Sequence, residues 1–209
     1  MKYLAASMVL LSGFTCARAG LADEVSPEIR SAALRVAVTT CATCHGPQGN
    51  SISPKFPRLA GQSAAYITAQ MKNFKNHARG DADAVGYMWG MAAPVDDDLI
   101  VGLADYYSKQ KPAAGEKSSD AAAIGRGKAI YTEGIAAGGV PPCASCHGAS
   151  AAGTADFPRL AGQTTQYLVK QLRAFHTNLR DVAVMHGVTS GLSAENINDV
   201  AAYLASLGP

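Results

Sequence analysis

Hydrophobic residues recur at helical spacing along most of this chain, and no convincing stretch alternates between apolar and polar positions. Two stretches, 96–109 and 193–207, each begin at a residue that can cap a helix and present a single apolar stripe. The same spacing predicts further helices at 29–40, at 124–131, after Ser63 and after Thr164. The pattern therefore predicts an all-α fold.

The predicted helices come in the same order twice, because the chain is an internal repeat. Residues 56–62, with the sequence FPRLAGQ, are identical to residues 157–163. The match continues downstream, where the paired residues are Tyr66 and Tyr167, Gln70 and Gln171, Phe74 and Phe175, and Met88 and Met185. A polar stretch with proline and glycine, 109–120, lies between the copies and is typical of a linker. We therefore expect an N-terminal domain at 20–112, which includes the start of the linker, and a C-terminal domain at 113–209.

The first residues have the layout of a secretory signal peptide. Lys2 is followed by an apolar run over 3–14 and then by Ala17-Arg18-Ala19, a small-x-small cleavage sequence. We expect residues 1–19 to be removed by cleavage after Ala19, or slightly later after Ala22. The export signal predicts a periplasmic protein.

Export also changes the charge of the chain. Without Lys2 and Arg18, 16 of the 18 basic residues remain against 16 acidic ones, so the mature chain is close to neutral. A neutral chain without a basic stripe argues against nucleic-acid binding, which depends on neutralising phosphates. No later segment approaches eighteen continuous apolar residues, so no membrane span is expected in the mature chain.

The candidate chemistry lies in two short cysteine sequences, one in each copy. They are Cys41-Ala42-Thr43-Cys44-His45 and Cys143-Ala144-Ser145-Cys146-His147. Two thiols and a histidine at this spacing form the attachment sequence of a c-type haem: the thiols bind the haem covalently and the histidine is the proximal iron ligand. We therefore expect two covalently bound haem c groups, with His45 and His147 as axial ligands.

Other interpretations of the cysteines fit less well. Four thiolates can hold a structural zinc ion, but here the pairs lie about a hundred residues apart in duplicated domains, each with its own histidine. A thioredoxin-like redox pair would need a βαβ pattern around it, and neither pair has one.

The second axial ligand must come from elsewhere in each copy. The candidates in the mature chain are Met71, Met88, Met91, Met185, His77, His176 and His186. Met88 and Met185 are equivalent in the repeat, so we predict them as the ligand pair. Met91 has no counterpart and is the weaker rival of Met88, while His77 and His176 leave ligation by two histidines as an alternative.

The paired CxxCH sequences, the paired FPRLAGQ segments and the paired methionines together resemble dihaem cytochrome c4, over essentially the whole mature chain. The resemblance implies two tandem class I cytochrome c domains related by a pseudo-twofold axis. It also implies that the carbonyl oxygens of Pro57 and Pro158 accept hydrogen bonds from the proximal histidines, and that Leu59 and Leu160 pack on the haem faces. One departure concerns the glycine that lets the first helix of such a domain cross the last. Gly127 and Tyr131 fit it, whereas the first copy offers only small residues such as Ala33 and Ala37.

A haem held by histidine on one side and methionine on the other has no open position for a substrate. We therefore expect an electron carrier and not an enzyme; a dihaem peroxidase would need an open position, and thiosulfate-oxidising relatives use a cysteine ligand. The resemblance implies redox protein partners, a quinol:cytochrome c oxidoreductase or dehydrogenase as donor and a membrane-bound terminal oxidase as acceptor. The carrier would be free in the periplasm or peripheral on the inner membrane. The alternative is the electron-accepting subunit of a periplasmic dehydrogenase, such as flavocytochrome c sulfide dehydrogenase.

Overall fold

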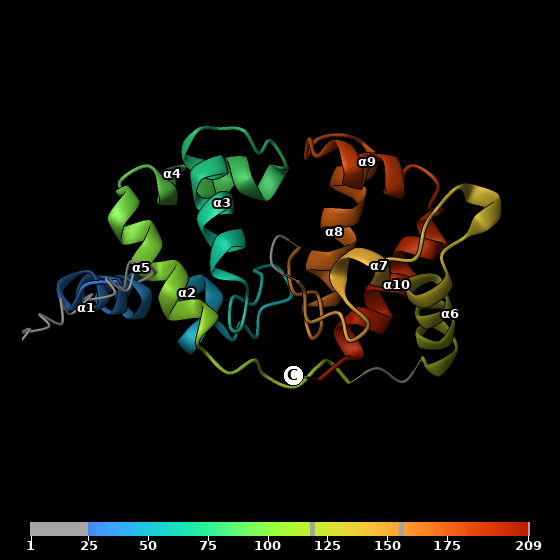
Figure 1. Cartoon of the computed structure of the whole chain (residues 1–209), viewed down its shortest axis with the longest axis horizontal. Helices are drawn as coiled ribbons and strands as arrows, with labels where there is room; N and C mark the ends of the chain where they lie inside the picture. The colour runs from blue at the N-terminus through green and yellow to red at the C-terminus, as the bar shows by residue number, and fades with distance from the viewer. Residues whose placement is uncertain (1–24, 118–119, 155–156, 209) are drawn as a thin grey trace, which may run out of the picture.

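The computed structural model describes residues 25–117, 120–154 and 157–208. Two helical halves lie side by side along the long axis of the molecule, and the chain that joins them runs along one edge (Figure 1). The described residues contain no strand, and their only β feature is an isolated bridge between Ile135 and Val140. The predicted all-α class is confirmed, while the predicted signal peptide at 1–19 lies outside the described residues.

Within residues 25–117, the N-terminal half contains five α-helices and three short turns of other helix types. Its elements are α1 (Pro27–Val36), the π-helix η1 (Ala37–Cys41), α2 (Ala42–His45), the 3₁₀-helix η2 (Pro47–Gly49), α3 (Ala64–Lys75), the π-helix η3 (Ala84–Met88), α4 (Trp89–Ala92) and α5 (Asp97–Ser108). The helix predicted at 29–40 is thus an α-helix only to Val36. Beyond it the chain widens into the π turn that ends at the first cysteine.

The C-terminal half has its main helices in the same order, with a longer connection between its first helix and its CxxCH turn. Its elements are α6 (Ala121–Glu133), the 3₁₀-helix η4 (Ala136–Gly138), α7 (Ala144–His147), α8 (Thr165–His176), α9 (Ala183–Thr189) and α10 (Ala194–Ser206). Thr164 precedes α8 as predicted, but its hydroxyl does not cap the helix. It instead donates to the carbonyl oxygen of Pro54 in the other half, at 3.3 Å.

Each half is built on a close crossing of its first and last helices. In the C-terminal half, a Cβ atom added to Gly127 of α6 would lie 2.0 Å from the carbonyl oxygen of Asp199 on α10. In the N-terminal half the glycine is on the last helix: a Cβ atom on Gly102 of α5 would lie 2.7 Å from Ile29 and 3.0 Å from Ala33. The expectation that only small residues of the first helix serve this crossing was incomplete, because here the last helix, α5, supplies the glycine.

The halves meet through their identical segments, and the hydrogen bonds across the contact are crossed. The Arg58 N–H donates to the Gln163 side-chain oxygen (2.8 Å), and the Gln163 amide nitrogen donates to the Arg58 carbonyl (2.9 Å). Arg159 and Gln62 make the same pair of bonds in the opposite direction, at 2.8 and 3.0 Å. This reciprocal pattern is what a pseudo-twofold axis between two tandem domains requires.

The connection between α5 and α6 is tied to both domains. The Asn50 side chain binds the backbone of Lys111 (3.1 Å) and Ala113 (2.7 Å) on one side. On the other side, the Glu116 carboxylate accepts from the Thr165 hydroxyl at 2.6 Å. The described part of this connection forms no helix or strand, in keeping with a linker; the exact boundaries at 112 and 113 stay a prediction.

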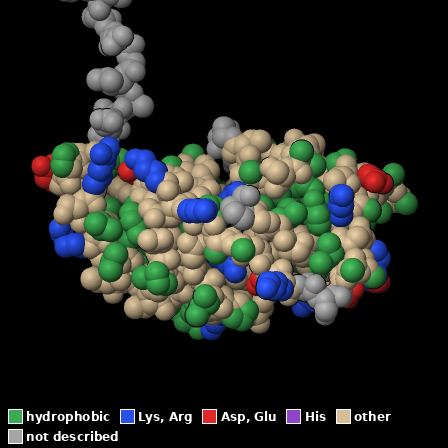
Figure 2. Space-filling view, turned by 90° about the horizontal axis from the view of Figure 1, so that it is seen from below, with side chains coloured by type: hydrophobic (Ala, Val, Ile, Leu, Met, Phe, Trp, Pro, Cys, Tyr) green, Lys and Arg blue, Asp and Glu red, His purple; other side chains and the backbone are tan. Residues whose placement is uncertain are grey.

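No helix within 25–117, 120–154 and 157–208 is both long enough and apolar enough to cross a membrane. On the face seen in Figure 2, lysines and arginines are scattered, some of them beside acidic side chains, and do not gather into a stripe.

Candidate haem sites

Each CxxCH sequence folds as a single helical turn that ends at a glycine. Cys44 and His45 lie in α2, Cys146 and His147 in α7, and the preceding cysteine is the N-cap residue in both cases. Gly46 follows with φ +75°, and a Cβ atom on it would lie 2.4 Å from the Asn50 carbonyl oxygen. The turn directly after the histidine therefore needs a residue with positive φ and no Cβ atom, which is glycine.

The cysteines of each pair are three residues apart on a helical turn, so both thiols face one side of it. All four are half-buried and unpaired, as thiols that attach a haem must be before attachment. Burial raises the pKa of the Cys41 and Cys143 thiols. The two pairs lie in different domains, and the described residues contain no cluster of three or more side chains that could hold a metal ion, so the zinc interpretation gains no support.

The histidines of both attachment sequences are buried and held in one orientation. His45 and His147 are 8% and 7% exposed. The Nδ1 atom of His45 lies 2.8 Å from the Pro57 carbonyl oxygen, and that of His147 lies 3.1 Å from the Pro158 carbonyl oxygen. A carbonyl can only accept, so Nδ1 carries the proton in each ring and the Nε2 lone pair is available for a metal.

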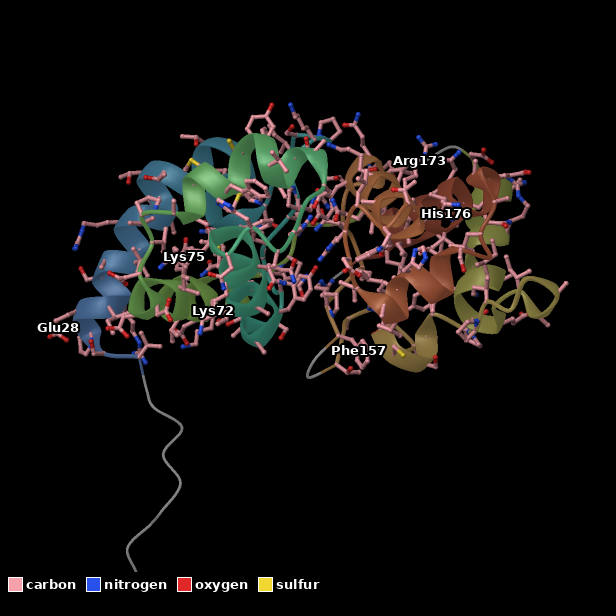
Figure 3. The ribbon with its side chains drawn as sticks, turned by 90° about the horizontal axis from the view of Figure 1, so that it is seen from above. Glu28, Lys72, Lys75, Phe157, Arg173 and His176 are labelled. Atoms are coloured by element: carbon pink, nitrogen blue, oxygen red, sulfur yellow. The ribbon has the colours of Figure 1, made fainter. Side chains whose placement is uncertain are left out.

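Burial also lowers the pKa of both histidines, and the hydrogen bond to the proline carbonyl only partly opposes it. The neutral imidazole, which is the form that binds iron, is thus favoured in the folded chain. An aromatic ring closes one side of each site: Phe56 lies edge-on to His45 with ring centroids 6.3 Å apart, and Phe157 to His147 at 5.9 Å. Phe157 projects beside α7 in Figure 3.

The leucines that the resemblance assigns to the haem faces lie at the edges of the two cores. Leu59 is half-buried against the cluster that includes Leu103 and Tyr107 of α5. Leu160 is half-buried against the equivalent cluster around Tyr131 and Leu204. Their contact with haem remains a prediction.

The structure distinguishes the candidate methionines by burial. Met88 ends η3 and is half-buried against the cluster of Phe74, Ala84 and Ala92, whereas Met91 on α4 is 44% exposed. Met71 packs against both N-terminal clusters as a core residue. Met185 is half-buried on α9, at the element that corresponds to η3. The assignment of Met88 and Met185 as ligands stays a prediction from the repeat.

The rival histidines are each engaged by the protein. His77 stacks on Trp89, with ring centroids 4.1 Å apart and planes 13° apart. The Nδ1 atom of His176 donates to the Thr189 carbonyl oxygen (2.7 Å), and that of His186 to the Phe175 carbonyl oxygen (2.9 Å). These contacts give each side chain a role in packing.

Sequence reasoning missed a buried charged cluster between the domains. Arg79 and Arg180 are each 5% exposed and bridge the glutamines of α3 and α8: both guanidinium groups donate to Gln70 (3.0 and 2.8 Å) and to Gln171 (2.8 and 2.7 Å). Asp81 is their only carboxylate partner among the described residues, 2.6 Å from Arg79. The two arginines occupy equivalent positions 101 residues apart, so a comparison of the two copies of the repeat could have singled them out.

These features fit a haem with its two propionate groups. The cluster holds two buried guanidinium groups and one carboxylate, an excess of positive charge that carboxylates would balance. The Tyr107 hydroxyl is buried close to Cys41 and has no hydrogen-bond partner among the described residues. Cys41, Cys44 and His45 would hold one haem, and Cys143, Cys146 and His147 the other.

Comparison with known proteins agrees with this geometry. The family model described as Cytochrome c matches residues 32–111 and 124–208. Cytochrome c-552 of Acidithiobacillus ferridurans is 38% identical over 205 residues, which cover 98% of this chain and 86% of the relative. Cytochrome c4 of Pseudomonas aeruginosa is 34% identical over 213 residues, covering 99% and 100% of the two chains.

Two further matches are informative. The solved structure of Acidithiobacillus ferrooxidans cytochrome c4 superposes with a TM-score of 0.76 at 40% identity, covering 80% of this chain and 98% of the other. A protein of Thiomonas intermedia named thiosulfate dehydrogenase electron acceptor is 33% identical over 173 residues, covering 80% of this chain and 78% of the relative.

The fold and the two attachment sites define a dihaem c-type cytochrome, an electron carrier with two covalently attached haem c groups. The chain belongs to the cytochrome c family and, within it, to the dihaem cytochromes c4.

Proposed function

We propose that this cytochrome works in the periplasm, where it accepts electrons from a quinol:cytochrome c oxidoreductase or a dehydrogenase and delivers them to a terminal oxidase. The observation that carries the proposal is that each domain has a buried histidine whose Nδ1 atom is hydrogen-bonded to a proline carbonyl oxygen. The two domains that hold these histidines are joined by the crossed hydrogen bonds. A body with two fixed redox sites can receive an electron at one end and release it at the other.

The proposed ligand set defines what the sites do. When bound, haem c supplies a one-electron couple between ferric and ferrous iron. His45 with Met88, and His147 with Met185, would fill both axial positions, which leaves no position for substrate and argues against enzymatic activity. The thioether of methionine favours the reduced state and so raises the reduction potential. The two cysteines of each site prevent loss of the cofactor after export.

A second candidate function is that of a dedicated electron acceptor for a periplasmic dehydrogenase. The observation that favours it is the similarity to the Thiomonas protein named as a thiosulfate dehydrogenase electron acceptor. It differs from the first in the identity of the donor, not in the chemistry of the sites.

Isolation of the protein from its own cells tests the two functions against each other. For a carrier we expect it to purify alone, to be reduced rapidly by membranes supplied with quinol, and to be reoxidised by the same membranes under oxygen. Co-purification with a dehydrogenase, together with reduction only when that dehydrogenase and its substrate are present, would replace the first function by the second. A chain retained in the cytoplasmic fraction would contradict both.

A further inference from the structure

The two peptide groups that bind the proximal histidines also bind the glutamines of the opposite domain. The carbonyl of the Pro57–Arg58 peptide accepts from His45 (2.8 Å), and its N–H donates to Gln163 Oε1 (2.8 Å). The Pro158–Arg159 peptide does the same with His147 (3.1 Å) and Gln62 (2.8 Å). Each histidine is therefore separated from a side chain of the other domain by a single peptide group.

We propose that Gln62 and Gln163 are positioning residues that act across the interface, each setting the reduction potential of the haem held in the opposite domain. The proposal rests on the axial roles that the proposed function gives to His45 and His147. It adds that the two redox sites are tuned by each other's domain, through Gln62 for His147 and Gln163 for His45.

The physical basis is the polarisation of hydrogen bonds in series. A peptide whose N–H donates to an acceptor carries more negative charge on its carbonyl oxygen, and linked bonds strengthen each other by roughly 10–30% in condensed phases. A more negative carbonyl binds the histidine Nδ1–H more strongly, which makes Nε2 a more basic ligand. A more basic ligand stabilises ferric iron, so the glutamine lowers the reduction potential of the haem in the other domain.

The glutamines are held so that this effect is not lost to motion or solvent. Both are 8% exposed. The oxygen of Gln62 also accepts from the Ser63 N–H (3.0 Å), and that of Gln163 from the Thr164 N–H (3.0 Å), at the starts of α3 and α8. The amide nitrogen of each donates across the interface, which fixes which end of the amide faces the arginine N–H. A low local dielectric leaves such a bond little screened.

The test is a potentiometric titration of the holoprotein with small redox mediators, in the variants Gln62→Met and Gln163→Met. Methionine has a similar length, and its thioether sulfur is only a weak acceptor for the arginine N–H. We expect Gln62→Met to raise the potential of the C-terminal haem more than that of the N-terminal haem, and Gln163→Met to do the reverse. The two haems are told apart by NMR, which also follows the Nδ1–H signals of His45 and His147.

The matched control is Thr164→Val, which removes the hydrogen bond to the Pro54 carbonyl across the same interface without touching either peptide. It should leave both potentials and both Nδ1–H signals in place. If Gln62→Met does not fold, Gln62→Asn withdraws the amide oxygen by one methylene and should shift the same haem in the same direction.

Equal shifts in both haems, a larger shift in the variant's own domain, or no shift at all would overturn the proposal. Because the titration uses mediators and no protein partner, such a result leaves the carrier function standing. Conversely, a different physiological donor would not alter the expected pattern of shifts.

Discussion

The methionine proposed to complete each iron site is the residue assignment on which the carrier function most depends. Met88 and Met91 are only three residues apart, so their distance from His45 along the sequence does not show which of them is the ligand. The structure places Met88 half-buried against the cluster of Phe74, Ala84 and Ala92 and leaves Met91 44% exposed. The choice of Met88 stays a prediction from the repeat. An exposed thioether would have to leave solvent and turn inward to reach iron.

We expect Met88→Ala to lower the reduction potential of the N-terminal haem and to halve the ferric absorption band that marks methionine ligation, because one of two thioether ligands is lost. Met185→Ala should remove the other half and affect the C-terminal haem. Potentiometry and absorption spectroscopy of the purified variants provide the check. Met91→Ala is the control and should leave the band at full intensity. If Met91→Ala halved the band and Met88→Ala did not, Met91 and not Met88 would be the ligand.

Residues with local signals were predictable from the sequence, and residues whose partners lie in the other domain were not. The attachment sites follow from a five-residue spacing, and their proline partners from the resemblance. The identical FPRLAGQ segments drew attention to Gln62 and Gln163 without revealing a role, since their partners Arg159 and Arg58 lie 97 and 105 residues away. No local periodicity reports such a contact.

Among the helices, sequence reasoning located the elements but not the way in which two of them cross. The N-terminal crossing uses Gly102 of α5 and the C-terminal crossing uses Gly127 of α6. At the position equivalent to Gly102 the second copy has Asp199, whose carboxylate binds Arg126 at 2.7 and 2.8 Å. A repeat predicts equivalent elements, yet each crossing needs only one glycine, and either helix can supply it.

The two crossings should differ in their tolerance of a methyl group. We expect Gly127→Ala to lower the free energy of unfolding by about 1–3 kcal/mol or more, because the new Cβ meets the rigid backbone carbonyl of Asp199 at 2.0 Å. Gly102→Ala should cost less, because its nearest neighbour is the end of the Ile29 side chain at 2.7 Å, which can move. Chemical denaturation of the holoprotein measures both.

Gly125 on α6 is the control for this comparison. It is exposed and has nothing within 4 Å of an added Cβ, so Gly125→Ala should raise the free energy of unfolding by up to about 1 kcal/mol through helix propensity alone. If Gly127→Ala proved as harmless as Gly125→Ala, the close crossing of α6 and α10 would be wrong.

At the scale of the whole molecule, the domains are held together by buried polar groups. The cluster of Arg79, Arg180 and Asp81 spans the interface with α8, where Gln171 donates to the Asp81 carboxylate at 3.2 Å. Burial of Asp81 favours its neutral form, but the hydrogen bond and charge of Arg79 outweigh burial and lower the pKa of this carboxyl. The ionised form is thus stabilised by folding.

It follows that Asp81 contributes stability above its unfolded pKa of about 3.9, and that this contribution is lost as the pH falls through the lowered folded pKa. We expect Asp81→Asn to reduce the free energy of unfolding at pH 7 by about 3 kcal/mol, because it removes the one carboxylate that the described residues supply to the buried guanidinium groups. The difference from wild type should shrink in strongly acidic solution. Denaturation curves at neutral and acid pH measure both effects.

Asp97 supplies the matched control on the surface. It is 68% exposed and lies 3.7 and 3.8 Å from Lys72 and Lys75, two side chains labelled in Figure 3. Asp97→Asn should change the free energy of unfolding by less than about 1 kcal/mol at either pH. An equal effect of the two substitutions would mean that the buried cluster is not what links stability to pH.

The crossed bonds of Gln62 and Gln163 have a consequence for how such a molecule could arise. Each domain offers the other the same acceptor and donor, which is the self-complementary surface of a symmetric homodimer. A single-haem ancestor could pair with its own copy through this surface, and fusion through 109–120 would then make the pairing independent of concentration. Lys170 forms an ion pair with Asp83, and the position equivalent to Lys170 in the first copy is Ala69. This pair is therefore a feature in which the two halves differ. In this interpretation, the two haem domains correspond to the two subunits of a homodimer that are now joined in one chain.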